Sequence, residues 1–358
     1  MTDSTEPAPR YTPCAHLWCI TPYFNPAHYR TRRANYELFA APIRAAGIPL
    51  LTVECAFGAD PFELPPGPDI LQVRCPHVLW QKERLLNLGV AHLSPQAAKV
   101  AWLDGDILFA NPDWAVQTAA LLDEFVVVQP FDRAIRLAEG ERSATPQHVA
   151  HESFASIWQQ DRSRVHAGGL DVHGHTGFAW AARRDLLANH GLYEAFVTSN
   201  GDHFHAHVFA GDLTSSCMRS VRQGSRLFGA SRRTRGSRLH VWLQWLSSGR
   251  LRGTLHNLPG IRQPNSRFWT HFLAWAEPVA AAVDGRIGCA PGHLLHLWHG
   301  DLADRQSGIG RQLLHEQGFD PACDIRIGPS GCIEWASDKP EIHRWLPEFF
   351  RRRREDGA

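Results

Sequence analysis

Short apolar runs alternate with longer amphipathic segments along the first part of the chain. Each run is bounded by polar or turn-forming residues, as is typical of strands buried on both faces. The amphipathic segments carry apolar residues at helical spacing. The predicted strands are 16–21, 49–56, 70–73, 100–103 and 125–129, and the predicted helices are 27–46, 80–92 and 114–122. Strands alternating with helices predict an α/β fold with a mostly parallel sheet covered by helices on both faces.

The pattern changes in the second part of the chain. Residues 133–175 are polar and bear several histidines, which predicts loops and one short helix. A strand at 177–181 and a helix follow. Residues 212–290 hold arginine- and serine-rich loops with tryptophan-bearing helical pieces, and a last strand is expected at 294–298, before a helix and the basic run 351–354. A basic run of this kind is usually the solvated end of a helix.

Composition narrows the class of protein. With 358 residues, of which 44% are hydrophobic and 20% charged, the chain is long enough for one large α/β domain with insertions, or for two smaller domains. A net charge of +1 gives no overall field that would attract nucleic acid, so nucleic-acid binding is disfavoured. No apolar run approaches the ~20 residues that cross a bilayer, and the amino end lacks the basic-then-apolar order of a secretory signal.

Eight cysteines and 21 histidines raise the question of metal binding. No cysteines form a CxxC pair and most lie in apolar runs. We interpret them as small buried side chains in a reducing compartment, which predicts a cytoplasmic protein. Histidines gather in two groups, His203, His205 and His207, and His293, His296 and His299. Either group could ligate a metal, but a packed polar side chain is the favoured interpretation for any single histidine.

The strongest chemical signal is the triplet Asp104-Gly105-Asp106, which directly follows the predicted strand 100–103. The carboxyl ends of strands are where α/β folds bind ligands. Residues two apart on an extended chain point the same way, so both carboxylates could meet one divalent cation such as Mn²⁺ or Mg²⁺. The alternative is a polar turn after a core strand, because Asp-Gly is also a common turn dipeptide.

Three further segments join this triplet in a recognisable order: ITPYFNPAHYRTR (20–32), TGFAWAARRDLLANHGLYEAFVTSNGD (176–202) and HLWHGDLADRQSGIGR (296–311). Together the four resemble metal-dependent glycosyltransferases of the GT-A fold, which use nucleotide-sugar donors. The triplet is similar to the DxD motif of that family. The segment ending at Asp202 resembles the galactosyltransferase region that leads to an acidic catalytic residue. The last segment is similar to the histidine segment that completes the metal site.

The resemblance implies roles for individual residues. Asp106 would bind the cation directly, and Asp104 would hold the ribose, the metal, or both. His299 is the first choice for a further metal ligand and His296 the second. The catalytic base would be Asp202, or its task would pass to His203, since this chain has Gly-Asp-His where the family carries a run of acidic residues. The alternative for Asp202 is a helix N-cap.

Nucleotide contacts are expected from the edges of the first strands. Thr21 and Tyr23 follow the first strand and could hold a base, and Glu54 ends the second strand and could accept from ribose or uracil. Lys82 and Asn87, on the helix before the aspartate strand, could reach phosphate and ribose. For each of these residues a solvated loop or helix position is an equally weighted alternative.

The resulting prediction is a metal-dependent, inverting hexosyltransferase. It would move a sugar from a nucleotide-diphosphate sugar, with UDP favoured, to a glycan or another hydroxyl-bearing acceptor. The alternatives are a sugar nucleotidyltransferase and a non-catalytic carbohydrate-binding protein. The predicted organisation is a disordered tail (1–14), a nucleotide-sugar-binding half (15–131), an acceptor and catalytic half (132–210), an insertion serving as lid or acceptor platform (211–290), a segment completing the metal site (291–345), and a basic tail that could touch a membrane surface (346–358).

Overall fold

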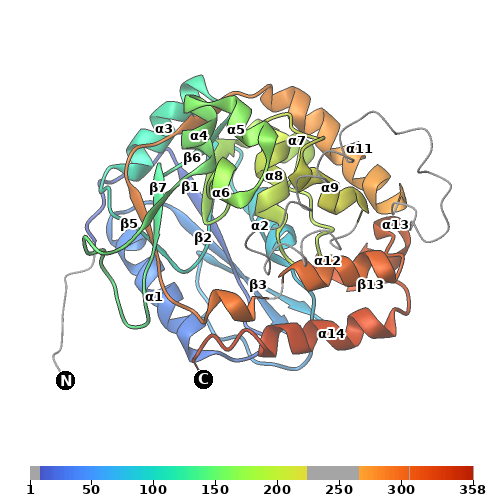
Figure 1. Ribbon diagram of the computed structural model, residues 1–358. Coiled ribbons are helices and arrows are strands. Elements are labelled where there is room, and N and C mark those ends of the chain that lie inside the picture. The colour runs from blue at the N-terminus through green and yellow to red at the C-terminus, as the bar shows by residue number, and fades with distance from the viewer. Residues whose placement is uncertain (1–8, 224–265, 306, 358) are drawn as a thin grey trace.

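A central sheet of seven strands organises the chain (Figure 1). The computed structural model describes residues 9–223, 266–305 and 307–357. The strand order is β10-β6-β9-β4-β1-β2-β3, and every strand except β9 runs in the same direction. The strands are β1 (Trp18–Tyr23), β2 (Leu50–Phe57), β3 (Ile70–Cys75), β4 (Lys99–Leu103), β6 (Val127–Gln129), β9 (Ala179–Arg183) and β10 (Ile287–Cys289). The predicted mostly parallel sheet is confirmed.

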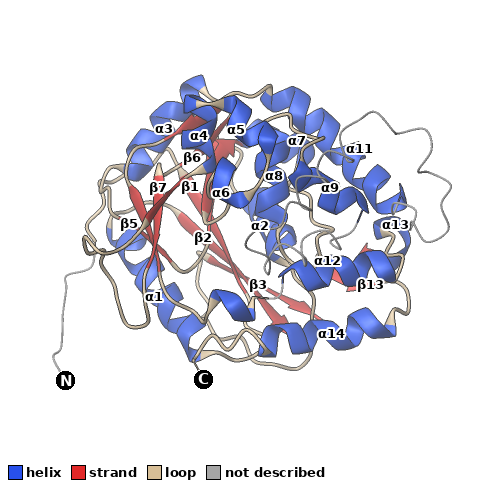
Figure 2. Cartoon of the chain, in the orientation of Figure 1, coloured by secondary structure: helices blue, strands red, loops and turns tan. Residues whose placement is uncertain are grey.

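Helices cover both faces of this sheet (Figure 2). Along β4 the side chains alternate, with Val100 and Trp102 in the core on one face and Ala101 and Leu103 in the core on the other. This is the period of two that a strand buried on both sides requires. One face packs against α1 (Arg30–Ala45) and α3 (Trp114–Glu124), and the other against α2 (Lys82–His92), α4 (Phe154–Gln160), α7 (Arg184–His190), α8 (Gly201–Phe209) and α11 (Ser266–Val283).

A second, four-stranded sheet joins distant parts of the chain in the order β5-β11-β7-β8. Its strands are β5 (Ile107–Phe109), β7 (Arg133–Arg136), β8 (Ala150–Glu152) and β11 (His293–His296). β11 pairs antiparallel with β5, opposing His296 to Ile107, and the amide of Leu297 donates to the carbonyl of Asp106 (2.9 Å). This pairing brings the carboxy-terminal histidine segment to the Asp-Gly-Asp turn.

The carboxy-terminal elements return to the first half of the chain. They are η2 (Leu302–Asp304), α12 (Ser307–Glu316), α13 (Pro321–Asp324), β12 (Ile325–Ile327), β13 (Ile333–Trp335) and α14 (Pro340–Arg351). Figure 1 shows β13 and α14 on the side of the molecule where β3 ends. The thiol of Cys75, at the end of β3, donates to the carbonyl of Ile333 (3.2 Å), and the ring of Phe350 stacks on that of Trp80.

The structure corrects three of the sequence predictions on organisation. Residues 133–175 hold β7, β8, α4, α5 (Arg162–Ala167) and α6 (Leu170–His173) rather than loops with one helix, because strands of three or four residues are too short to show a period. Of the predicted disordered tail 1–14, residues 9–14 are described, and there Tyr11 is buried and its hydroxyl accepts from the amide of Phe109 (3.0 Å). The prediction that the basic run 351–354 is solvated is wrong for Arg353, which is buried.

The predicted insertion at 211–290 lies partly outside the described residues, which omit 224–265. Its described parts are α9 (Ser216–Gln223), α11 and β10. β10 is not separate from the main domain, because it pairs with β6 at the edge of the central sheet. The role of lid or acceptor platform remains a prediction.

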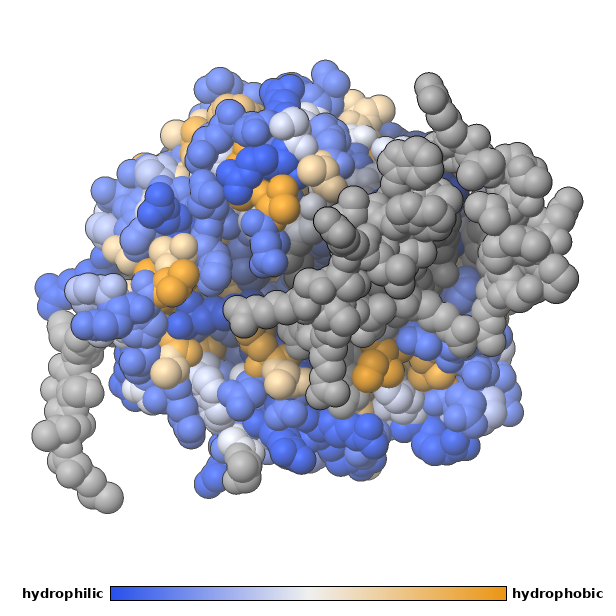
Figure 3. Space-filling model, in the orientation of Figure 1, coloured by the Kyte–Doolittle hydropathy of each residue, from blue (hydrophilic) through white to orange (hydrophobic). Residues whose placement is uncertain are grey.

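Within the described residues, no helix is both long and apolar enough to cross a membrane. Figure 3 shows a mainly hydrophilic described surface on this face, with apolar side chains in separate spots.

Candidate active site

The Asp-Gly-Asp turn lies at the carboxyl end of β4, in the middle of the central sheet. The amide of Asp104 donates to the carbonyl of Phe178 (2.8 Å), which continues the pairing of β4 with β9 for one more residue. Asp106 then leads directly into β5. The two carboxylates make different contacts: Asp104 pairs with Lys82 at 2.5 Å, whereas Asp106 pairs with His299 at 3.0 Å.

Asp106, His296 and His299 form a set of three candidate metal ligands. The Nε2 atom of His299 lies 3.0 Å from Asp106 Oδ2 and 3.1 Å from His296 Nε2, and His296 Nε2 lies 3.8 Å from Asp106 Oδ1. Both histidines are buried, and Asp106 Oδ1 is buried without a hydrogen-bond partner among the described residues. Two imidazoles and a carboxylate suit a divalent cation and leave positions for outside oxygens.

The electrostatics of this set favour an ionised carboxylate. Burial alone would raise the pKa of Asp106, but the attraction of His299, to which its carboxylate is hydrogen-bonded, and of the Arg32 guanidinium outweighs burial and holds that pKa well below its usual range. Burial also lowers the pKa of His296 far below its usual value, which keeps this imidazole neutral. An ionised carboxylate and a neutral imidazole are the forms that bind a cation. Arg305 also reaches the same place, with Nη2 at 2.8 Å from His299 Nε2.

A carboxylate near the end of the chain contacts the nitrogen of His299 that faces away from Asp106. Glu355, whose side chain is 1% exposed, lies 3.5 Å from His299 Nδ1 and accepts from Arg32 (2.8 Å) and Arg353 (2.6 Å). A carboxylate on the far nitrogen of a ligating histidine fixes the orientation of the ring. Sequence reasoning missed Glu355, and the prediction of a solvated basic end holds for Arg351 and Arg352 but is wrong for Arg353.

Lys82 connects the aspartate turn to the start of α8. Its Nζ lies 2.5 Å from Asp104 Oδ1 and 2.6 Å from Asp202 Oδ2, and both carboxylates raise the pKa of Lys82 against the effect of its burial. Asp202 therefore faces the aspartate turn rather than capping its helix. The N-cap position belongs to Asn200, and α8 shows no side-chain cap at all. The capping alternative for Asp202 is thus not what the structure shows.

Backbone conformation is unusual around this point. Ser199 and Asn200, which precede α8, adopt φ angles of 88° and 75°, and Phe178 adopts 80°. Left-handed conformations of non-glycine residues are costly and gather at functional sites. All three residues line the same cavity as the aspartates.

Glu83 is a buried acid beneath this arrangement. Its side chain lies against Gly201 at the start of α8, and burial together with the charge of Asp202 raises its pKa to about 8. A folded-state pKa above the unfolded value stabilises the fold fully below the unfolded value, and this contribution is lost as the pH rises towards 8.

We expect Glu83→Gln to change the pH dependence of stability. The amide keeps the size of the side chain but cannot ionise, so the melting temperature of the variant relative to wild type should rise between pH 5 and pH 9. Thermal melts of both proteins across this range measure the difference. A constant difference at all pH values would show that Glu83 ionises in the fold as it does in the unfolded chain.

The aspartate turn, the two histidines His296 and His299, and the Lys82–Asp202 pair surround a cavity of about 490 Å³. Five arginines line it, together with Lys82 and the aromatic side chains of Phe24, Trp80 and Phe178. The arginines are Arg32, Arg136, Arg305, Arg311 and Arg353. Arginine clusters of this kind bind anions with delocalised charge, phosphates above all. Arg136 and Arg353 come from segments predicted as loop and solvated tail, and no motif in the sequence pointed to them.

Of the predicted nucleotide contacts, Thr21 and Tyr23 lie near the Asp-Gly-Asp turn, whereas Glu54 and Asn87 do not. Thr21 lies within β1, close to Gly105, and its buried hydroxyl has no partner among the described residues. Tyr23 lines a small recess with Asp106 and His299, but its hydroxyl donates to Glu63. The structure does not bring Glu54 to the cavity, because its carboxylate accepts from the amides of residues 63 and 64 and from the side chain of residue 72.

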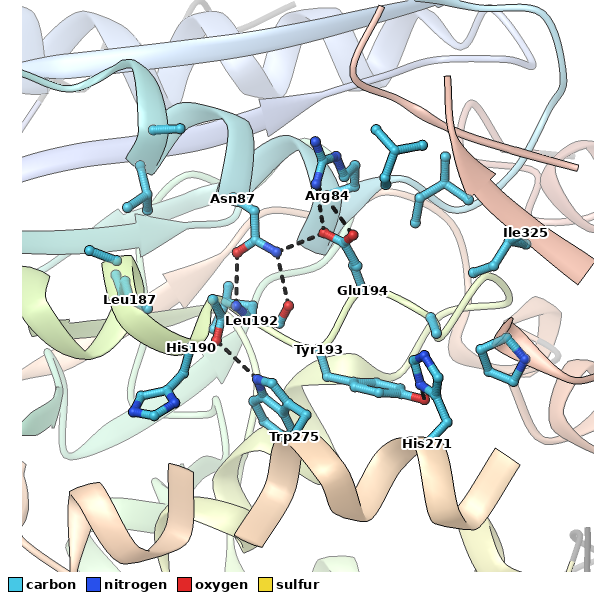
Figure 4. A pocket seen from close by; sticks show the side chains of 18 of the residues that line it. Arg84, Asn87, Leu187, His190, Leu192, Tyr193, Glu194, His271, Trp275 and Ile325 are labelled. Atoms are coloured by element: carbon cyan, nitrogen blue, oxygen red, sulfur yellow. Dashed lines mark hydrogen bonds and ion pairs between the residues drawn. The ribbon is translucent and has the colours of Figure 1, made fainter. Parts of the chain in front are cut away.

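Asn87 lies in a different and larger cavity, of about 630 Å³, between α2, α7 and α11 (Figure 4). There its side-chain amide donates to Glu194 (2.8 Å) and to the carbonyl of Leu192 (2.9 Å). Arg84 pairs with the same carboxylate (3.2 Å), and the hydroxyl of Tyr193 pairs with His271 (2.9 Å). The polar side chains named here thus pair with one another, whereas the smaller cavity holds the candidate cation ligands and the arginines, so we place the candidate active site at the smaller one.

His203 follows Asp202 and lines the same cavity. Its ring packs against His173 and His207, with ring centroids 5.2 and 4.9 Å away. Burial lowers the pKa of His203 to about 4. The second histidine of the group, His205, accepts from the amide of Tyr193 (3.0 Å) and lies outside this contact.

A search of protein-family models finds no match, and neither does a search of curated proteins. Among solved structures, the catalytic domain of Drosophila β1,4-galactosyltransferase 7 in complex with xylobiose is similar over 55% of this chain and 61% of that one, at 12% identity and a TM-score of 0.29. A mutant of the same galactosyltransferase in complex with manganese, UDP-Gal and xylobiose matches at 13% identity, over 54% of this chain and 61% of that one, with a TM-score of 0.28.

The 4-diphosphocytidyl-2C-methyl-D-erythritol synthase of Anaerococcus prevotii is similar over 52% of this chain and 78% of that one, at 13% identity and a TM-score of 0.29. This chain thus spans less than two thirds of the galactosyltransferase domain that it matches. Likenesses at these identities and TM-scores carry no functional weight, so the function must be argued from this chain's own residues.

Proposed function

We propose that this protein transfers a sugar from a nucleotide-diphosphate sugar, with UDP the favoured nucleotide, to a hydroxyl-bearing acceptor, and that it does so with a divalent cation and with inversion. The observation that carries the proposal is that Asp106, His296 and His299 open into the same cavity as the Lys82–Asp202 pair and five arginines. Cation ligands, anion-binding side chains and a carboxylate base are the parts that such a transfer needs.

The donor side of the reaction is assigned to the cation set and the arginines. Asp106, His299 and His296 would hold Mn²⁺ or Mg²⁺, which acts as a Lewis acid towards the leaving diphosphate. Arg305 donates to His299 Nε2, so it would have to turn towards the diphosphate when that nitrogen binds the cation. The remaining arginines would hold the phosphate oxygens, and Trp80 would offer aromatic surface to the base.

The acceptor side is assigned to Asp202. Its Oδ2 is held by Lys82, which fixes the carboxylate and leaves Oδ1 to take the proton of the acceptor hydroxyl. A single base that activates the acceptor for direct displacement gives inversion at the anomeric carbon. Asp104 shares Lys82 with Asp202, so it sets the position of the lysine in addition to any contact with the ribose.

A donor panel tests the proposal. The protein is incubated with UDP-, GDP- and dTDP-sugars and Mn²⁺, and slow hydrolysis of one donor class is expected, because water replaces the absent acceptor. A parallel incubation supplies nucleoside triphosphates with sugar 1-phosphates. Pyrophosphate release in that incubation alone would favour the sugar nucleotidyltransferase, and turnover in neither would contradict the proposal.

Removing a histidine ligand should weaken cation-dependent binding of UDP. We expect His299→Ala to reduce the affinity for UDP in the presence of Mn²⁺, and His296→Ala to reduce it less. Glu355→Gln should lower the affinity for the metal by about 10- to 100-fold, because Glu355 orients a ligand. His293→Ala is the matched control, because His293 lies on the same strand but is exposed. Titration calorimetry with UDP at several Mn²⁺ concentrations measures the effect. Equal affinities in all four variants would leave the segment a structural role only.

A further inference from the structure

A second group of metal-type side chains lies under α8, apart from the Asp106 set. It consists of His173 at the end of α6, His203 and His207 on α8, and Cys217 on α9. One ligand atom from each residue can be chosen so that all four lie within 4.8 Å of one another. His173, His207 and Cys217 are buried, and His203 is partly buried.

The histidine nitrogens that point into this group are unsatisfied. His173 Nε2, His207 Nε2 and His203 Nδ1 are buried and have no hydrogen-bond partner among the described residues. Burying polar atoms without partners is costly, and three of them at one place call for a shared partner. Aromatic packing does not satisfy them, and the polar group that they share is the thiol of Cys217, which interacts with all three rings.

The outer nitrogens of two of these rings are already held. His207 Nδ1 pairs with the buried carboxylate of Asp212 at 2.7 Å, and His173 Nδ1 donates to the carbonyl of Gly174 at 2.9 Å. Asp212 is itself fixed by the amides of Thr214 (3.2 Å) and Ser215 (2.9 Å). Carboxylates and backbone carbonyls on the far nitrogen are the usual partners of histidines that bind a metal, because they leave the other nitrogen as a lone-pair donor.

We propose that His173, His203, His207 and Cys217 bind a zinc ion. Three imidazoles and one thiolate suit zinc, whereas Mg²⁺ and Mn²⁺ prefer the oxygen ligands of carboxylates and phosphates. Four protein ligands close the tetrahedral coordination sphere, which is typical of a structural site. The proposal does not rest on the proposed function, because its ligands are not part of the Asp106 set, but two of them, His203 and Cys217, also line the cavity of the candidate active site.

The consequence for the fold is a cross-link among α6, α8 and α9. α8 carries Asp202 in its first turn, one residue before the ligand His203. A zinc ion would therefore fix the start of α8 relative to the loop before β9 and to α9. It would also make His203 a ligand, which leaves Asp202 as the candidate base.

Metal analysis of the untagged full-length protein tests the proposal. After dialysis against metal-free buffer, and again after reconstitution with zinc and removal of the excess, we expect about one zinc per chain, because closed four-ligand sites hold zinc tightly. X-ray absorption at the zinc edge should give one sulfur and three nitrogen ligands. The His296→Ala/His299→Ala double variant should keep this zinc.

Cysteine variants provide the second arm. Cobalt substituted for zinc should show a thiolate-to-cobalt charge-transfer band in wild type, and Cys217→Ser should lose it. Cys332→Ser is the matched control, because Cys332 is also buried and lies 3.9 Å from the sulfur of Cys55 in a separate group of thiols. Absence of zinc and cobalt binding in wild type, two or more sulfur ligands per zinc, or a band that survives Cys217→Ser would overturn the proposal. The absorption spectrum of wild type decides even if Cys217→Ser does not fold.

Discussion

Asp106→Ala is expected to abolish turnover, lowering it by at least roughly 10³-fold, while the protein remains folded. Asp106 supplies the one carboxylate of the proposed cation set, and a Lewis-acid metal contributes several kcal/mol to a transition state in which a diphosphate leaves. Each ~1.4 kcal/mol corresponds to a tenfold change in rate. The side chain is 21% exposed and lies in a turn after β4, so its loss leaves the packing of the sheet unchanged.

Calorimetric titration separates the cation role from a structural one. Wild type should bind UDP more tightly with Mn²⁺ than without it, and Asp106→Ala should bind UDP weakly in both conditions. Asp301→Ala serves as the control, because Asp301 is an exposed acid two residues after His299. If wild type binds UDP equally well with and without Mn²⁺, the cation has no part in donor binding and the hypothesis is wrong.

The first half of the fold was predictable because its signals are local. The run 100–103 is apolar on both faces, and the structure places its alternate residues in the two cores that helices build on the sheet. The position of Asp104 and Asp106 at a strand end follows from the same pattern. The contact of Asp106 with His296 did not follow from any local pattern. It depends on the pairing of β5 with β11, two short strands far apart in sequence.

Other residues of the candidate site were missed for a different reason. Glu355 and Arg353 sit in a charged run that reads as a solvated end, and their burial results from packing against α1 and the histidine segment. Among the proposed zinc ligands, sequence spacing predicts only the pair on one helix. His203 and His207 are four residues apart, so on a helix they share a face, whereas His205 points elsewhere. Nothing local connects them to Cys217, which composition classed with the buried hydrophobic cysteines.

Asp202→Asn is expected to lower the rate of sugar transfer by roughly 10² to 10⁴, the usual contribution of a general base. Asparagine keeps the size of the side chain and its contact with Lys82, but it cannot take the proton of the acceptor hydroxyl. Lys82 keeps its ion pair with Asp104, so the buried ammonium is not left without a counter-charge. Donor binding and melting temperature should therefore stay close to wild type while turnover falls.

The matched control is Asp185→Asn, because Asp185 is also an acid in the first turn of a helix, α7, but is exposed and lies away from the cavity. A role of Asp202 in helix stability alone would give both variants the same small effect, since losing a favourable first-turn charge costs about 0.3–1 kcal/mol and leaves the rate unchanged. The anomeric configuration of the product adds a further check that does not depend on any variant. Transfer with retained configuration would reject direct displacement, and an Asp202→Asn variant with the wild-type rate would show that the proton leaves by another route.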